Sequence, residues 1–238
     1  MRTEPVQPTR GCLLDRSADT LARVTITIEE IQVGDDAAAW AAAGFAVDGD
    51  TCRIGSVAVR FVGSAGPRGV RSWVLAGVDP AAAAAFESAE GVSTSVATAA
   101  TTSGFGVHPL GVTQIDHLVL MTPHIARTTA SLEALGLAVR RVRDAELAGS
   151  PVRQVFFRLG EVILEVIGAP TGEGEGPATF WGITHAVADI DAAAAYLGER
   201  SGRVKDAVQP GRRITTVRTR DMDVSVATAL ISPQPPRA

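Results

Sequence analysis

The sequence predicts an α+β fold assembled from tandem β-α-β-β-β modules. Short runs of branched and aliphatic residues, which favour strands, alternate with helix-length segments that carry apolar residues at helical spacing. The order of one strand, one helix and three strands occurs over residues 115–169 and again over residues 179–232. A less complete version of the same order precedes them, so related modules cover nearly the whole chain.

The module over residues 115–169 has the clearest elements. We expect strands over residues 114–122, 138–142, 153–159 and 162–168, and a helix over residues 125–135. Ile125, Leu132 and Leu135 lie along one side of this helix, and Gly136 closes it.

The following module repeats this order at an offset of 65 residues. We expect strands over residues 180–188, 204–208, 213–219 and 224–231, and a helix over residues 190–197. The offset matches three pairs of apolar positions, namely Ile125 with Ile190, Leu132 with Leu197, and Val139 with Val204. These coincidences indicate a repeat.

The N-terminal part of the chain follows the pattern less completely. We expect an alternating strand over residues 24–33, a short helix over residues 36–43, and a strand pair over residues 51–55 and 57–62. A strand over residues 72–79 then leads into an alanine-rich helix, and most later strands of that module are missing.

The modules define the predicted domains. Residues 1–22 and 234–238 are expected to be tails, because they contain prolines and no sustained periodicity. Residues 23–107 form a degenerate domain and residues 114–233 a complete one. The chain can bury a real core, because 46% of its 238 residues are hydrophobic.

Composition excludes several classes of partner. The net charge is -4 and the basic residues are dispersed, so we expect no nucleic acid partner. The two cysteines have no metal-site or disulfide spacing. No segment has the length of a signal peptide core or of a membrane span, which predicts a cytoplasmic protein without a membrane partner.

Two polar residues interrupt apolar strands of the same module. His117 lies within Ile115–Met121, and Glu165 lies within Val162–Ile167. A buried carboxylate needs a partner, and a divalent cation is one. Imidazole and carboxylate together suit zinc, iron, manganese or nickel. Alternatively, either side chain simply faces solvent on the polar side of its strand.

Three segments of the C-terminal modules carry a family resemblance. They are Asp116-His117-Leu118-Val119-Leu120, Leu132-Glu133-Ala134-Leu135-Gly136-Leu137 and Ile163-Leu164-Glu165-Val166. They resemble the vicinal oxygen chelate superfamily, which includes glyoxalases, bleomycin-resistance proteins and extradiol dioxygenases. Residues 180–183 and 207–214 look like its glyoxalase-like branch. The resemblance implies a glyoxalase-like fold in which paired modules form curled, cup-shaped mixed sheets around a divalent metal.

The resemblance also implies roles for individual residues. His117 and Glu165 match metal ligands on the first and last strands of a module, and Glu165 is the candidate catalytic proton carrier. His185 is the candidate for a third ligand, but it needs a bulge to face the same side as His117. Thr228 aligns with Glu165 in the second module and is a poor ligand.

Four further residues are candidates for substrate binding. Arg212 and Arg213 follow a turn and precede a strand, so that one of them can enter the cup and hold a carboxylate or enolate. The other is expected at the solvated strand entrance. Phe157 and Trp181 are candidates for lining a small-molecule pocket, with plain core packing as the alternative.

The leading functional interpretation is a divalent-metal-dependent lyase, isomerase or epimerase that chelates adjacent oxygens of a small metabolite. An extradiol-type dioxygenase is a variant that requires His117 and His185 on one face. The alternatives are a protein that sequesters an antibiotic or metabolite without chemistry, and a paralogue that survives as a structural partner. A homodimer is consistent with the exposed sheet edge of the N-terminal modules.

Overall fold

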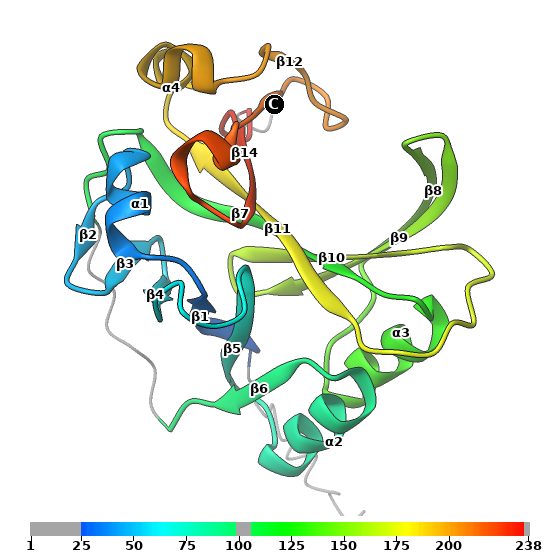
Figure 1. Cartoon of the computed structure of the whole chain (residues 1–238). Helices are drawn as coiled ribbons and strands as arrows, with labels where there is room; N and C mark the ends of the chain where they lie inside the picture. Colours follow the sequence, from blue (N-terminus) through cyan, green and yellow to red (C-terminus); the bar gives the residue numbers. More distant parts are fainter. Residues whose placement is uncertain (1–24, 99–105, 236–238) are drawn as a thin grey trace, which may run out of the picture.

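The structure is a computed structural model that describes residues 25–98 and 106–235, and it consists of two mixed β-sheets (Figure 1). The N-terminal sheet has six strands in the order β2-β3-β4-β1-β5-β6, and the C-terminal sheet has eight in the order β12-β13-β14-β11-β7-β10-β9-β8. The predicted tail over residues 1–22 lies outside the described residues, as do residues 236–238 of the other predicted tail. The boundaries of the predicted domains remain a prediction.

The N-terminal sheet contains one complete module and one reduced module. Its elements are β1 (Thr27–Val33), α1 (Ala37–Ala42), β2 (Val47–Asp48), β3 (Thr51–Ile54), β4 (Val57–Phe61), β5 (Val70–Ala76), α2 (Pro80–Glu90) and β6 (Ser93–Val96). Strand β1 pairs with β4 in parallel and with β5 in antiparallel orientation. Strand β6 pairs with β5 directly after α2, so the second module keeps a single strand after its helix.

The C-terminal sheet contains two complete modules, which confirms the predicted tandem α+β fold. Its elements are β7 (Val112–Met121), α3 (Ile125–Ala134), β8 (Arg141–Leu147), β9 (Ser150–Leu159), β10 (Val162–Gly168), β11 (Thr179–Val187), α4 (Ile190–Leu197), β12 (Lys205–Asp206), β13 (Arg213–Thr216) and β14 (Ala227–Ile231). The modules meet where β7 and β11 pair in antiparallel orientation. Short 3₁₀ helices cover Gly198–Arg200 and Thr219–Met222.

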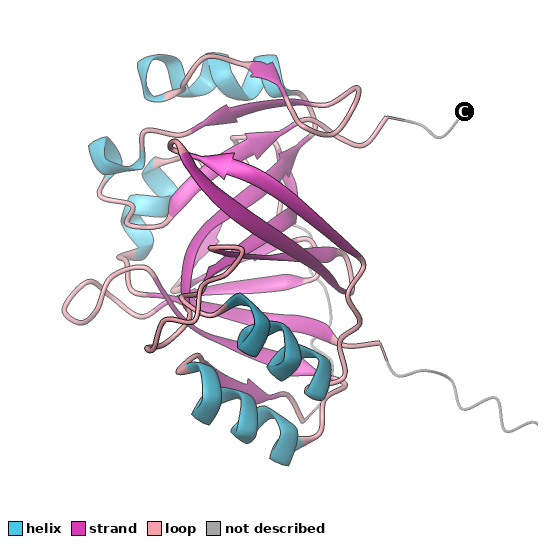
Figure 2. Ribbon diagram, turned by 90° about the vertical axis from the view of Figure 1, so that its right-hand side faces the viewer, coloured by secondary structure: helices cyan, strands magenta, loops and turns pink. Residues whose placement is uncertain are grey.

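Local sequence explains where the helices begin and what they bury. Asp189 caps α4 by accepting hydrogen bonds from the backbone N–H groups of Asp191 and Ala192 at 2.9 and 3.1 Å. Ile190 and Leu197 of this helix are buried, like their counterparts in α3. The helices lie at the periphery of the strand layers (Figure 2). Within the described residues, none is long and apolar enough to cross a bilayer.

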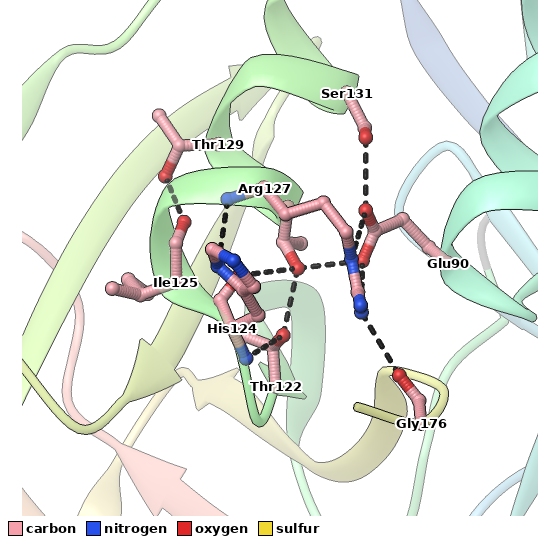
Figure 3. Close-up of polar contacts among 9 residues, drawn as sticks. Glu90, Thr122, His124, Ile125, Arg127, Thr129, Ser131 and Gly176 are labelled. Carbon is pink, nitrogen blue, oxygen red and sulfur yellow. Dashed lines mark hydrogen bonds and ion pairs between the residues drawn. The ribbon is translucent and has the colours of Figure 1, made fainter. Parts of the chain in front are cut away.

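The two sheets share one hydrophobic core, whose buried residues come from both. Glu90, at the end of α2, is fully buried and joins the sheets through α3 (Figure 3). Its carboxylate accepts hydrogen bonds from the hydroxyls of Thr128 and Ser131 at 2.6 and 2.8 Å, and it forms an ion pair with Arg127 at 3.2 Å. Arg127 also donates to the carbonyl of Gly176 at 2.9 Å. Helices α2 and α3 consequently lie side by side (Figure 1).

Two other carboxylates link the sheets at separate places. Asp35 forms an ion pair with Arg68 at 3.0 Å and accepts a hydrogen bond from the backbone N–H of Ser225 at 3.0 Å. Glu161 accepts hydrogen bonds from the backbone N–H and the hydroxyl of Ser56 at 2.7 and 3.0 Å. These links fix the N-terminal sheet against both modules of the C-terminal sheet.

Candidate functional site

One face of the C-terminal sheet carries a cavity of about 620 Å³ that residues of both modules line. His117 on β7 and Glu165 on β10 are among them. The parallel pairing of these strands places His117 opposite Ile163 and Glu165 opposite Val119. Because paired residues share a face and side chains alternate, His117 and Glu165 lie on the same face. The structure therefore brings these two predicted residues together.

A bulge next to His117 determines how its ring is held. In the pairing of β7 with β11, Thr184 lies opposite His117 and His185 opposite Ile115, so Asp116 is the extra residue. The Asp116 carboxylate contacts Nδ1 of His117 at 2.5 Å. A carboxylate beside Nδ1 favours the proton on that nitrogen, which leaves Nε2 as the nitrogen available to a ligand.

Arg212 completes this arrangement behind His117. Its Nη2 donates to Asp116 at 2.7 Å and its Nε donates to the carbonyl of Ser232 at 2.8 Å. Burial on its own would raise the pKa of Asp116, but hydrogen bonds and charges from His117 and Arg212 outweigh burial and hold the pKa below its ordinary value. Asp116 is therefore a carboxylate that orients the imidazole.

Glu165 is held by a chain of side chains on the neighbouring strands. Gln154 on β9 donates through Nε2 to Oε1 of Glu165 at 2.5 Å, and its own Oε1 accepts from Nε of Arg143 at 2.7 Å. Burial raises the pKa of Glu165 above its ordinary value, although the charges of His117 and Arg143 act in the opposite direction. A carboxyl group in this state is suited to proton transfer.

The wall of the cavity is strongly cationic. Five of the lining residues are basic, against two carboxylates, Glu165 and Asp206. The basic residues are Arg140, Arg141, Arg143, Arg158 and Lys205. The apolar part of the lining includes Phe156, which pairs directly with Glu165, together with Ile163, Ile214 and Val208. The cavity thus offers an apolar floor, a paired imidazole and carboxylate, and excess positive charge.

His185 does not lie with the other two predicted metal ligands. It follows Thr184, which lines the cavity, and its side chain faces the opposite side of the sheet. There it is fully buried and packs edge-on against the rings of Trp40 and Phe45, with centroid distances of 6.3 and 5.1 Å. A bulge is present beside these residues, but its extra residue is Asp116 on β7, so Thr184 and His185 of β11 keep their regular alternation and face opposite sides.

The two predicted arginines also lie outside the cavity lining. Arg212 is buried against Asp116, as described above, and it acts on His117 from behind. Arg213 is exposed and forms a two-armed ion pair with Asp191 of α4 at 2.7 and 2.8 Å. Neither guanidinium is placed to touch a ligand in the cavity, because each is already committed to a carboxylate.

The predicted aromatic residues are placed differently from each other. Phe157 is among the residues that line the cavity, but it is buried and pairs with Leu164, whereas its neighbour Phe156 lines the cavity from the position opposite Glu165. Trp181 is 56% exposed and lines a separate hollow of about 170 Å³ beside Gly182. The alternation of strand β9 decides this: residues 154, 156 and 158 share one face of the strand, and residue 157 lies on the other.

The donor set fits a divalent ion held by two protein ligands, with the other positions left to substrate and water. The module formed by β11, α4 and β12–β14 adds no metal ligand at the equivalent positions. Its strand register puts Gly182 opposite Ala227 and Thr184 opposite Ala229, so Gly182 and Ala229 correspond to His117 and Glu165. This corrects the alignment of Thr228 with Glu165 by one residue. Among the described residues, no group of three or more His, Cys, Asp or Glu side chains is placed to hold a metal.

The fold and the cavity define a class of protein in which paired β-α-β-β-β modules enclose a small-molecule site. Residues 114–223 match the sequence profile of the Glyoxalase/Bleomycin resistance protein/Dioxygenase superfamily. This part of the chain is therefore a domain of that superfamily, as the sequence resemblance predicts. No curated protein matches the sequence.

Solved structures resemble this chain at low sequence identity. A variant of 4-hydroxymandelate synthase from Streptomyces coelicolor has 11% identity and a TM-score of 0.61, with 89% of this chain and 94% of that chain covered. A fusion of a xylose isomerase-like TIM barrel with 4-hydroxyphenylpyruvate dioxygenase has 13% identity and a TM-score of 0.57, covering 89% and 49%. Methylmalonyl-CoA epimerase from Mycobacterium tuberculosis has 14% identity and a TM-score of 0.42, covering 57% and 94%.

Sequence reasoning missed the residues that hold the two central side chains. Asp116 precedes His117, but adjacent strand residues normally face opposite sides, and only the bulge lets them touch. Gln154 and Arg143 pair across the β8–β9 hairpin. The sequence signal for Arg143 was its spacing of two residues from Arg141, because residues two apart lie on the same face of a strand.

Proposed function

We propose that the protein is a divalent-metal-dependent enzyme of the lyase, isomerase or epimerase type. Its substrate is a small molecule with two adjacent oxygens, bound in the cavity of the C-terminal sheet. The observation that carries the proposal is the placement of His117 and Glu165 on one face of two paired strands, inside a cavity of about 620 Å³. His117 through Nε2 and Glu165 through its carboxylate would hold the ion.

The remaining steps belong to side chains of this chain. Asp116 contacts Nδ1 of His117, and Arg212 holds Asp116 in place, so together they orient the imidazole toward the ion. Gln154 orients Glu165, which takes and returns a proton at the carbon next to the substrate carbonyl when it is not a ligand. The ion, when bound, supplies Lewis-acid stabilisation of the negative charge that develops on the substrate oxygens.

Metal content tests this proposal directly. Protein purified without chelator is analysed by mass spectrometry, and we expect one ion per chain. His117→Ala and Glu165→Gln should each lose it. His185→Leu is the matched control, because it removes a histidine on the opposite face of the same sheet and should keep the ion. A metal-free wild-type protein, or a metal that survives loss of His117, contradicts the proposal.

A second candidate function is binding of a small molecule without chemistry. This function is favoured by Gly182 and Ala229, which leave the module of β11–β14 without a metal ligand at the two positions equivalent to His117 and Glu165. A metal-free protein that still binds an aromatic ligand in the cavity would support this function instead. An extradiol-type reaction is not part of the proposal, because His185 and His117 lie on opposite faces.

A further inference from the structure

Two arginines on β8 face the cavity beside Glu165. The strand register pairs Arg141 with Phe156, and Phe156 in turn with Glu165. Neighbouring strands lie about 4.8 Å apart, so the Cα atoms of Arg141 and Glu165 are separated by roughly 10 Å, within reach of an extended arginine side chain. Arg143 lies two residues further along the same face.

Arg143 is held in place before any ligand arrives. Its Nε donates to Gln154, its guanidinium carbon lies 5.9 Å from the centroid of the Phe156 ring, and the residue is half-buried. Within the described part of the chain, its two terminal nitrogens have no hydrogen-bond partner. Gln154 joins this arginine to Glu165, so a group bound to the free nitrogens lies next to the candidate proton carrier.

The cavity face of the β8–β9 hairpin differs in charge from its outer face. Arg153, on the outer face, forms an ion pair with Asp144 at 2.7 Å. Arg140, Arg141 and Arg143 form no ion pair within the residues that the structure describes. Several uncompensated guanidinium groups beside a partly apolar cavity create a positive potential that favours an anionic ligand.

We propose that Arg140, Arg141 and Arg143, the arginine wall, bind the carboxylate or phosphate group of an anionic substrate, and that Arg143 determines this specificity. The inference rests on the proposed function and names the substrate class for the same cavity. The anionic group lies against the arginine wall, and the oxygen-bearing part of the molecule reaches His117 and Glu165. A guanidinium binds either anion through paired N–H donors.

Calorimetric titration with two separate probes, malonate and inorganic phosphate, tests the arginine wall on metal-free, full-length protein at low salt. We expect the wild type to bind at least one of them, and the tighter probe identifies the anionic group. Arg143→Gln should weaken that binding by about tenfold or more, because it removes hydrogen bonds between two charged groups. The matched control Arg153→Gln should bind as the wild type does, and uncharged malonamide should not bind.

Two results would overturn the inference: neither anion binds the wild type in the millimolar range, or Arg143→Gln binds as tightly as the wild type. If Arg143→Gln does not fold, Arg141→Gln replaces it, with the same expected loss. Glu165→Gln separates this inference from the proposed function, because it should lose metal and keep anion binding. Anion binding by a wild-type protein that takes up no metal would leave the arginine wall standing and reject the metal-dependent enzyme.

Discussion

His185 makes the stability of this protein depend on pH. The ring is fully buried, and burial lowers the pKa of His185 to about 3, with the nearby His108 acting in the same direction. In the unfolded chain the ordinary pKa of a histidine is about 6.5. Between these two values the unfolded state binds a proton that the folded state does not bind.

The sign and the size of the effect follow from this difference. Because the folded-state pKa is lowered, the contribution of His185 to stability is intact above about pH 6.5 and decreases as the pH falls toward 3. At pH 5 the unfolded state gains about 2 kcal/mol from protonation of this one residue, and the loss approaches roughly 5 kcal/mol below pH 3. The folded protein should therefore be less stable in mild acid.

Urea unfolding of the wild type and of His185→Leu, followed by circular dichroism at about pH 8 and pH 5, measures this contribution. The free energy of unfolding of the wild type should fall by about 2 kcal/mol more than that of the variant. At the higher pH the variant should be at least as stable, because neither ring nitrogen of His185 has a hydrogen-bond partner within the described residues. Equal losses in the two proteins would refute the reasoning.

Three further outcomes are expected. Glu90→Ala removes the shared acceptor of the α2–α3 contact and should cost about 3–5 kcal/mol of unfolding free energy in urea, and a loss below about 1 kcal/mol would contradict the role assigned to it. Gly182→Ala puts a Cβ 2.5 Å from the carbonyl oxygen of Ala227, so its melting temperature should fall through separation of β11 from β14, whereas an unchanged value would show that the strands adjust freely. Cys52 is buried and its pKa is raised by burial to about 12, so in a Cys12→Ser background a thiol reagent should react only after unfolding, and fast labelling of the native protein would disprove this.

The alternation of apolar residues and the repeat at an offset of 65 predicted most elements, because both follow from packing against one core. Ile125, Ile190, Leu132 and Leu197 are all buried at matching positions. The strand predicted over residues 138–142 begins earlier in the sequence than the observed strand β8. It extends over Arg141–Leu147 with charged residues on both faces, since the hairpin continues beyond the core, and hydrophobic periodicity carries no signal there.

The site was harder to predict, because strand registers shift by single residues. The offset of 65 holds from β7 to β11, but the register of β14 corresponds to an offset of 64, so the counterpart of Glu165 is Ala229 and not Thr228, which lies at an offset of 63. A one-residue shift exchanges the faces of a strand. The bulge at Asp116 is also a one-residue irregularity, and it brings Asp116 into contact with His117.

The N-terminal sheet shows how the same two positions lose their chemistry. Its β1–β4 register places Glu30 opposite Ala58, as His117 lies opposite Ile163, and Arg60 two residues further on takes the place of Glu165. Arg60 and Glu30 form an ion pair at 3.0 Å beside a cavity of about 650 Å³. Two opposite charges that satisfy each other offer no ligand to a cation. Within residues 25–98 and 106–235, the duplicated fold therefore contains one candidate metal position, and binding of two ions per chain would contradict this interpretation of the repeat.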